Sequence, residues 1–317
     1  MTSASAPGKV ILFGEHSVVY GQPAIAVPVS QVRATATISA EFPHPTLHLP
    51  NLDQQHTLTP NRSASDIDIP LAEAVRQVQT YLGLETLPAL TLRLDSHIPI
   101  ASGMGSGAAA AAAIIRALLQ HFGAVISAEL IANLTYNVEK LFHGTPSGID
   151  NTVVAYEQPV YFVRQQPNNL IETVTIQTPI ELLIADTGVR SSTKLAVADV
   201  RQGWQAEPSK FNRLFAACGQ TADRARSALE TGNLAQLGAL MWQTHALLQT
   251  MTVSSAELDT LVEAARGAGA LGAKLSGAGR GGNMICLISA ETRDQVSNAL
   301  HAAGAKSVIY SQIAQTD

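Results

Sequence analysis

Apolar residues recur along the chain at spacings that predict interleaved strands and helices. Apolar or alternating runs typical of strands occupy 9–13, 24–29, 32–38, 47–49, 56–58, 90–94, 160–163, 182–185, 284–288 and 307–313. Apolar positions three and four apart predict helices over 71–82, 130–141, 210–230, 234–251, 255–268 and 292–303. This order of elements predicts an α+β protein.

The length of the chain fits about two domains. A polar stretch separates the predicted strands at 160–163 and 182–185, and we place the boundary there, near residue 178. The predicted domains are therefore 1–178 and 179–317. Pro146 suits the first position of a further short helix that carries 147–154, and Thr145 before it suits the N-cap.

A glycine-rich stretch, Pro99-Ile-Ala-Ser-Gly-Met-Gly-Ser-Gly107, lies between a predicted strand and six consecutive alanines at 108–113. Alanine is the best helix former, so a helix is predicted directly after the glycines. A glycine loop at a helix N-terminus presents free N–H groups to an anion, most often phosphate. The stretch matches neither the Walker A pattern nor G-x-G-x-x-G, and a flexible loop before a buried helix is the alternative.

A second glycine-rich stretch, Lys274-Leu-Ser-Gly-Ala-Gly-Arg-Gly-Gly282, also follows a strand-like run. It fits either a tight turn or the lining of a phosphate site. Two such stretches in one chain favour phosphate binding more than either does alone.

Composition narrows the class of protein. Hydrophobic residues make up 46% and charged residues 14% of the chain, which predicts a large core. The net charge is −5 without a basic block, which argues against a nucleic-acid partner. The cysteines, Cys218 and Cys286, fit neither a disulfide framework nor a zinc site, and the N-terminus lacks the pattern of a secretory signal. The cysteine pattern fits a reducing cytoplasm, so we predict a cytoplasmic protein. The uncharged run before Arg116 consists mainly of Gly, Ala and Ser, so we predict no membrane span.

Several polar residues are candidates for chemistry. Lys9 opens a predicted strand, where it is either a solubilising edge residue or a charge directed at phosphate. Glu15 and His16 lie in a turn between strands, which is either plain surface or a site. Glu139 and Asp150 flank a Gly-Thr-Pro break, where they are either solvated acids or a metal ligand and a base.

The segment after the strand at 182–185 contains Arg190 and Thr193. It fits either the polar start of a helix or a site for a small anion such as a carboxylate. Asp150 has an ordinary explanation as well, since an acid near a helix N-terminus stabilises the helix dipole.

Together these residues resemble the GHMP kinases, the family of galactokinases, homoserine kinases, mevalonate kinases and phosphomevalonate kinases. The family's motifs appear in order as Ala6-Pro-Gly-Lys-Val-Ile-Leu-Phe-Gly-Glu-His-Ser-Val-Val-Tyr-Gly21, Ile98-Pro-Ile-Ala-Ser-Gly-Met-Gly-Ser-Gly-Ala-Ala109, and the second glycine-rich stretch at 274–282. The segments 14–21, 139–150 and 186–194 resemble the branch that acts on mevalonate. The resemblance covers nearly the whole chain.

The resemblance implies a two-domain GHMP kinase fold, with an N-terminal domain like ribosomal protein S5 domain 2 and a ferredoxin-like C-terminal domain. It implies ATP-dependent phosphorylation of the C5 hydroxyl of mevalonate, with Mg²⁺ as cofactor and a homodimer as one expected assembly. Asp150 and Lys9 would be catalytic, and Glu139 and Ser106 would hold Mg²⁺. The nucleotide would contact Pro99, Ala101, Ser102, Gly103, Met104, Gly105, Ser106, Gly107 and Ala108. Mevalonate would contact Lys9, Glu15, His16, Asp150, Arg190, Thr193, Gly277 and Ala278.

The chain departs from the family pattern at two positions. Gly107 stands where a second serine is usual, which leaves Ser106 or a water to meet Mg²⁺. Arg280 stands where a glycine is usual, and it either reaches phosphate or points outward. Other small-molecule kinases of the family, acting on phosphomevalonate, on the 3-hydroxyl of mevalonate or on a sugar, are alternatives, as is a non-catalytic ligand sensor on the same fold.

Overall fold

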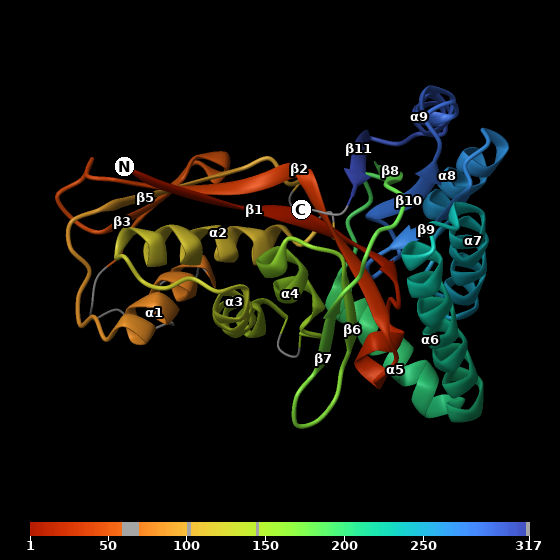
Figure 1. The fold of residues 1–317 in the computed structure, drawn as a ribbon, viewed down its shortest axis with the longest axis horizontal. Coiled ribbons are helices and arrows are strands. Elements are labelled where there is room, and N and C mark those ends of the chain that lie inside the picture. The colour runs from red at the N-terminus through yellow and green to blue at the C-terminus, as the bar shows by residue number, and fades with distance from the viewer. Residues whose placement is uncertain (59–69, 100–102, 144–145, 315–317) are drawn as a thin grey trace. The chain divides into compact units, whose positions relative to one another are not determined.

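The computed structural model describes residues 1–58, 70–99, 103–143 and 146–314 (Figure 1). These residues form two compact units whose segments interleave along the chain. Unit 1 comprises Met1–Gly8, Ser30–Ile100 and Gly105–Glu157, and unit 2 comprises Lys9–Val29, Ala101–Met104 and Gln158–Asp317. Each is described below by itself. The boundary near residue 178 stays a prediction.

Unit 1 combines a sheet with a group of helices. Its strands β3 (Thr46–Leu49), β4 (Gln54–Thr57), β5 (Thr91–Ser96) and the second part of β2 (Ala24–Ser39) lie in the order β4-β3-β5-β2. The β3/β5 pair is parallel, and the others are antiparallel. The helices are α1 (Pro70–Leu82), α2 (Ser106–His121), α3 (Ala128–His143) and α4 (Ile149–Tyr156).

Helix α2 is the core of unit 1. It packs against α1, α3, α4 and β5. The predicted alanine helix is confirmed, and all six alanines at 108–113 are buried, as are Ile114 and Ile115. Small side chains let several neighbours approach one helix closely, which explains an alanine run inside a core. The helix begins at Ser106, so the last glycine of the loop, Gly107, lies in its first turn. The N–H groups of a first turn have no partner within the helix.

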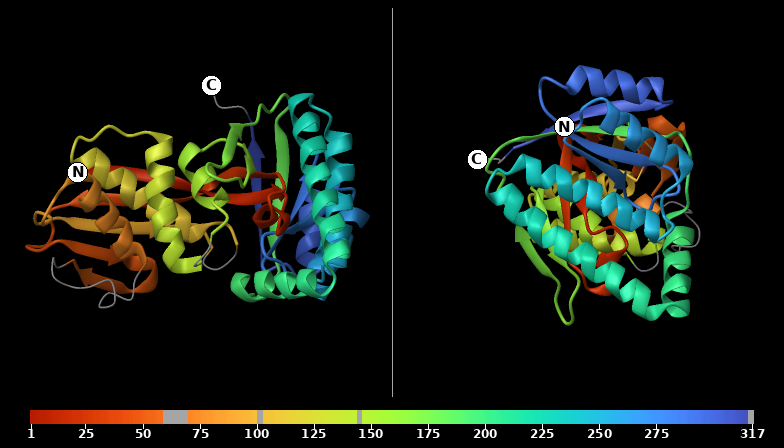
Figure 2. Two further views of the ribbon diagram at one scale, coloured as in Figure 1. Left: turned by 90° about the horizontal axis from the view of Figure 1, so that it is seen from below. Right: turned by 90° about the vertical axis from the view of Figure 1, so that its right-hand side faces the viewer.

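Unit 2 is built on an antiparallel sheet with the order β11-β8-β10-β9. Its strands are β8 (Ile180–Asp186), β9 (Gly272–Ser276), β10 (Asn283–Ile288) and β11 (Ser307–Ile313). Helices α6 (Pro208–Glu230), α7 (Leu234–Thr250), α8 (Ala256–Gly267) and α9 (Arg293–Ala302) contribute to one apolar core with it. Figure 2 shows α7 and α8 lying over the sheet.

Unit 2 contains several further elements outside this sheet. Strand β1 (Thr2–Phe13), whose residues from Lys9 onward belong to unit 2, ends just before Gly14, and a short 3₁₀ helix, η1 (Ser17–Tyr20), follows. The first part of β2 pairs with β6 (Val160–Val163), which pairs in turn with β7 (Leu170–Thr173). Helix α5 (Thr193–Ala206) packs against α6.

The structure corrects several predicted elements. The strands expected at 24–29 and 32–38 are one strand, β2, because the exposed Ser30 and Gln31 do not break the extended backbone. Helix α4 begins at Ile149 instead of Pro146, because Gly148 has a φ of 94°, which is outside the helical range. The expected cap, Thr145, lies outside the described residues.

Strand β7 was not predicted, β9 was indicated only as a strand-like run before the second glycine stretch, and the start of α5 was one of two interpretations of the segment that contains Thr193. Helix α5 buries only Ala196 and Val200, so its apolar period is weak, and β7 is a mostly exposed strand. Within the described residues, the structure has no helix that is both long and apolar enough to cross a membrane.

Candidate active site

The predicted phosphate loop leads into the N-terminus of α2. Gly105 caps this helix with a φ of 68°, a left-handed value that favours glycine. A glycine cap has no side chain to accept from the first turn, so the N–H groups of Ser106, Gly107 and Ala108 remain at the positive end of the helix dipole. This local geometry suits an anion such as phosphate. Pro99 precedes the loop in unit 1, whereas Ala101 and Ser102 lie outside the described residues.

Three packed helices of unit 1 carry the other candidate oxygen ligands. Ser106 opens α2, Glu139 lies in the second half of α3, and Asp150 lies in the first turn of α4. Helix α3 packs against both α2 and α4. The side-chain amide of Asn151 ties α4 to α3 by donating to the carbonyl oxygen of Ala132 over 3.0 Å. Glu139 is buried, and Asp150 is half-buried in the first turn of α4.

The donor chemistry of this group fits Mg²⁺. One hydroxyl and one carboxylate are hard oxygen ligands of the kind that Mg²⁺ takes. Among the described residues there is no cluster of three or more His, Cys, Asp or Glu side chains that would form an all-protein metal cage. Mg²⁺ in phosphoryl-transfer enzymes is bound through one or two carboxylates, substrate phosphates and water, so Ser106 and Glu139 are a suitable protein contribution.

The first motif contributes Lys9, Glu15 and His16 to unit 2. Lys9 is buried near the middle of β1, and its backbone N–H donates to the carbonyl oxygen of Met104 over 3.0 Å. This bond ties Met104, from the phosphate loop, to β1. The turn at 14–16 is tight, since Gly14 has a φ of 95° and a Cβ there would lie 2.5 Å from Ala24. Gly14 therefore has to be glycine.

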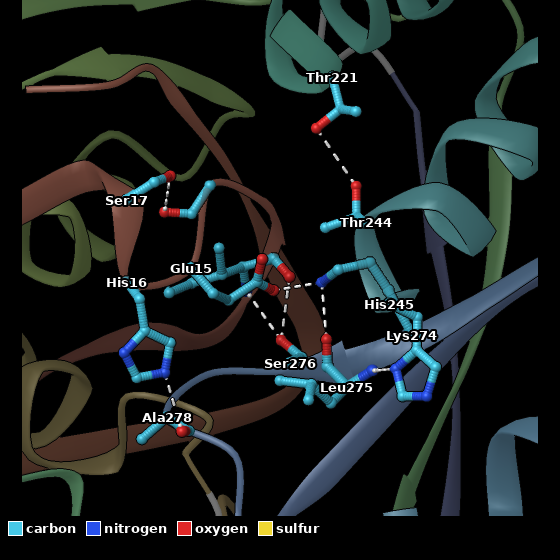
Figure 3. A network of polar contacts seen from close by, with 12 residues as sticks. Glu15, His16, Ser17, Thr221, Thr244, His245, Lys274, Leu275, Ser276 and Ala278 are labelled. Carbon is cyan, nitrogen blue, oxygen red and sulfur yellow. Dashed lines mark hydrogen bonds and ion pairs between the residues drawn. The ribbon is translucent and has the colours of Figure 1, made fainter. Parts of the chain in front are cut away.

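His16 is buried and has a left-handed φ of 59°. Its Nε2 lies 2.9 Å from the carbonyl oxygen of Ala278, so Nε2 carries the proton and donates (Figure 3). Burial lowers the pKa of His16 to about 4, the bond to Ala278 opposes that shift, and Arg280 adds to it. The imidazole is thus neutral at neutral pH, with Nδ1 as an acceptor.

The loop of the third motif is attached to the segment that carries Arg190 and Thr193. Ser191 Oγ donates to the carbonyl oxygen of Gly279 over 2.7 Å, and the Gly282 N–H donates to that of Val189 over 2.8 Å. Arg190 and Thr193 are exposed beside this connection, and Thr193 begins α5. The structure therefore brings His16, Gly277, Ala278 and the 187–193 segment into one region of unit 2.

Arg280 extends this attachment to α5. Its guanidinium forms an ion pair with Asp199, and its backbone N–H donates to the carbonyl oxygen of Val253 over 2.8 Å. Arg280 has a φ of 58°, which suits the glycine that is usual there. The sequence left open whether Arg280 reaches phosphate or points outward. In the structure its side chain is paired with Asp199.

Sequence reasoning assigned no role to three residues that hold these motifs together. Lys274 is fully buried and forms an ion pair with the equally buried Glu15 (Figure 3). Ser276 Oγ donates to the carbonyl oxygen of Ile11 over 3.0 Å and accepts from its N–H over 3.2 Å. His245 Nδ1 accepts from the Leu275 N–H over 3.3 Å. The available signal was a lysine, Lys274, that opens the second glycine-rich stretch directly after a strand-like run.

Both cysteines, Cys218 and Cys286, are free and buried. Burial raises the pKa of each thiol to about 12, so both are protonated at neutral pH. Substrate, nucleotide and metal contacts by the residues named above stay predictions.

Comparisons with known proteins agree with the resemblance seen in the motifs. The family model for the N-terminal domain of GHMP kinases matches residues 70–158, and the model for the C-terminal region of GHMP kinases matches 225–306. The mevalonate kinase of Thermococcus sibiricus is 34% identical over 96% of this chain and 94% of its own. That of Pyrococcus horikoshii is 36% identical over 95% of this chain and 92% of its own.

Solved structures agree with the fold. The crystal structure of L. major mevalonate kinase in complex with R-mevalonate has a TM-score of 0.85 and 31% identity, and covers 100% of this chain and 97% of its own. The Methanococcus jannaschii mevalonate kinase has a TM-score of 0.84 and 26% identity, and covers 99% of this chain and 98% of its own. On these similarities, together with the motifs, the chain belongs to the GHMP kinase family and has its two-domain α+β fold.

Proposed function

We propose that this protein is a mevalonate kinase, which transfers the γ-phosphoryl group of ATP to the C5 hydroxyl of mevalonate and releases 5-phosphomevalonate and ADP. The observation that carries the proposal is the similarity to mevalonate kinases along nearly the whole chain. Phosphoryl transfer requires positioning and charge neutralisation more than covalent chemistry by the protein. The side chains of both units can be assigned to these tasks.

Residues of unit 1 would bind the phosphates and accept the proton. The N–H groups at the start of α2 suit the phosphate oxygens of ATP. As the C5 oxygen attacks the γ-phosphorus, the bond to the β–γ bridging oxygen breaks and the hydroxyl proton passes to the carboxylate of Asp150. Ser106 and Glu139 would hold Mg²⁺, which neutralises phosphate charge when bound.

Residues of unit 2 would bind the acceptor. Lys9 supplies a buried positive charge suited to the attacking oxygen and the transferred phosphoryl group. The exposed Arg190 suits the carboxylate of mevalonate, with Thr193 as a neighbouring hydrogen-bond donor. His16, held neutral by burial, can accept a hydrogen bond from a substrate hydroxyl at Nδ1. The backbone of Gly277 and Ala278 would complete this pocket.

A panel of acceptors tests the proposal. ADP release is measured with ATP and Mg²⁺ in the presence of mevalonate, phosphomevalonate, galactose or homoserine. We expect turnover with mevalonate and none above background with the others. A preference for phosphomevalonate or a sugar would contradict the proposed substrate, and binding of ATP and mevalonate without ADP release would indicate a ligand sensor. A cytoplasmic location, suggested by the sequence, and a homodimer, suggested by the resemblance to the family, are further parts of this proposal.

A further inference from the structure

The third motif faces the first motif through alternate residues of one strand. Successive side chains of a strand point to opposite faces, so Lys274 and Ser276 of β9 share a face, while Ala273 and Leu275 point to the other. Ala273 and Leu275 lie in the apolar core. Lys274 instead contacts Glu15 (Figure 3). Ser276 bonds to the backbone of Ile11. Two residues further on, the carbonyl oxygen of Ala278 accepts from His16.

The ion pair between Lys274 and Glu15 is costly to bury. Both side chains are fully shielded from solvent, and burial raises the pKa of Glu15 and lowers that of Lys274, while their mutual attraction opposes both shifts. Replacing such a pair by apolar residues is often neutral or stabilising, so stability alone does not account for it. Within the described part of the chain, the second oxygen of Glu15 is buried and accepts no hydrogen bond.

The pair is held from both sides. Lys274 Nζ also donates to the carbonyl oxygen of Leu275 over 2.7 Å. The Leu275 N–H donates to His245, whose Nε2 lies 3.1 Å from Asp259 on α8. On the other side, Glu15 lies between Gly14, which is fixed by its close approach to Ala24, and His16. A shift of the pair therefore moves the turn that orients His16.

We propose that Lys274 is a positioning residue for the acceptor site: its ion pair with Glu15 sets the register between the turn at 14–16 and the loop that begins at Gly277. The consequence is that His16 is held against Ala278, with its second ring nitrogen available to substrate. This inference rests on the proposed function for its kinetic consequence, whereas its structural consequence, the fixed environment of His16, is independent of the reaction.

The test compares Lys274→Met with the double variant Glu15→Gln/Lys274→Met. The single variant leaves a buried carboxylate without its cation and should lower stability. The double variant removes both charges, so its midpoint of thermal unfolding should return toward that of the wild type. Lys210→Met is the matched control, because Lys210 forms an exposed ion pair with Glu207 three residues away on the surface.

The first readout is structural. The pKa of His16 is measured by NMR titration of its ring protons, which are assigned with a His16→Gln variant. In the double variant we expect this pKa to move upward from about 4 toward the ordinary value of 6.5, because the ring loses its fixed buried position. The Lys210→Met protein should titrate like the wild type. A wild-type titration of His16 in a folded double variant would overturn the inference.

The second readout is kinetic. In the double variant the KM for mevalonate should rise about tenfold, the equivalent of one lost hydrogen bond, with a smaller change in kcat. If the double variant unfolds at nearly the wild-type midpoint and its KM for mevalonate is unchanged, the ion pair between Lys274 and Glu15 has only a structural role, which would contradict the inference. Absence of mevalonate turnover in the wild type would contradict the proposed function instead, and the His16 titration would still decide the role of Lys274.

Discussion

Replacing Arg116 by methionine should destabilise unit 1 through helix α4. The guanidinium of Arg116 donates to the carbonyl oxygens of Ala155 and Ser5 over 2.7 Å each and to that of Val154 over 3.3 Å. It also pairs with Glu157, the residue that ends α4. A cation that caps the last carbonyls of a helix satisfies them and opposes the negative end of the dipole.

The magnitude follows from these contacts. A hydrogen bond from a charged donor contributes about 1.5 kcal/mol, so the two shorter carbonyl bonds together contribute about 3 kcal/mol. The pair with Glu157 adds little, because that side chain is about one-third exposed and keeps a second partner in Arg33. We therefore expect Arg116→Met to lower the free energy of unfolding by about 3 kcal/mol.

Urea-induced unfolding followed by circular dichroism measures this loss, and amide hydrogen exchange in α4 localises it. Arg33→Met is the matched control, because Arg33 contacts the same Glu157 and the side chain of Ser5 but no carbonyl of α4. It should cost about 1 kcal/mol and leave exchange in α4 nearly unchanged. Equal losses in the two variants would refute the assignment of the stabilisation to the carbonyl oxygens of Ala155 and Ser5.

Three further predictions concern the site. Asp150→Asn should keep ATP binding but lower kcat about 10²- to 10⁴-fold, since it removes the proton acceptor; near-normal turnover would exclude that role. His16 has a folded pKa of about 4, below its unfolded value, so the stability that it contributes at pH 7 should fall as the pH drops from 6.5 toward 4. His16→Gln should remove about 2 kcal/mol of the pH dependence of unfolding between pH 7 and 4.5, and an identical pH profile would contradict the neutral imidazole. Gly279→Ala should impair folding or the loop, because its Cβ would lie 1.9 Å from the carbonyl oxygen of Val253, and an unchanged unfolding midpoint and KM would show that the loop can relax.

Strong local signals made much of the fold predictable. The alanine run, the apolar stripes of α3 and α6 to α8, and the last strand all follow directly from composition and period. Strand β7 was missed, and helix α5 was left as one of two interpretations of its first residues, because both elements bury few residues and show only a weak apolar period. The start of α4 was misplaced because the positive φ of Gly148 is set by the fold.

The parts of the candidate site that lie within one short motif were predictable. The contacts between residues far apart in the sequence were not. The glycine loop and the Glu15-His16 turn were evident from short stretches of sequence. The partnership of Glu15 with Lys274, 259 residues away, has no local signature, because an ion pair buried between two motifs depends on how the strands fold together. The link from Arg280 to Asp199 on α5 is of the same kind.

The position of the phosphate on the product tests the central claim most directly. Mevalonate is incubated with ATP, Mg²⁺ and the enzyme, and the product is examined by ³¹P and ¹³C NMR, in which phosphorus couples to the carbon that bears the ester oxygen. The account predicts coupling to C5 and equimolar ADP. Coupling to C3 would retain the family and its chemistry but contradict the proposed function, and no phosphorylated mevalonate at all would reject the proposed substrate.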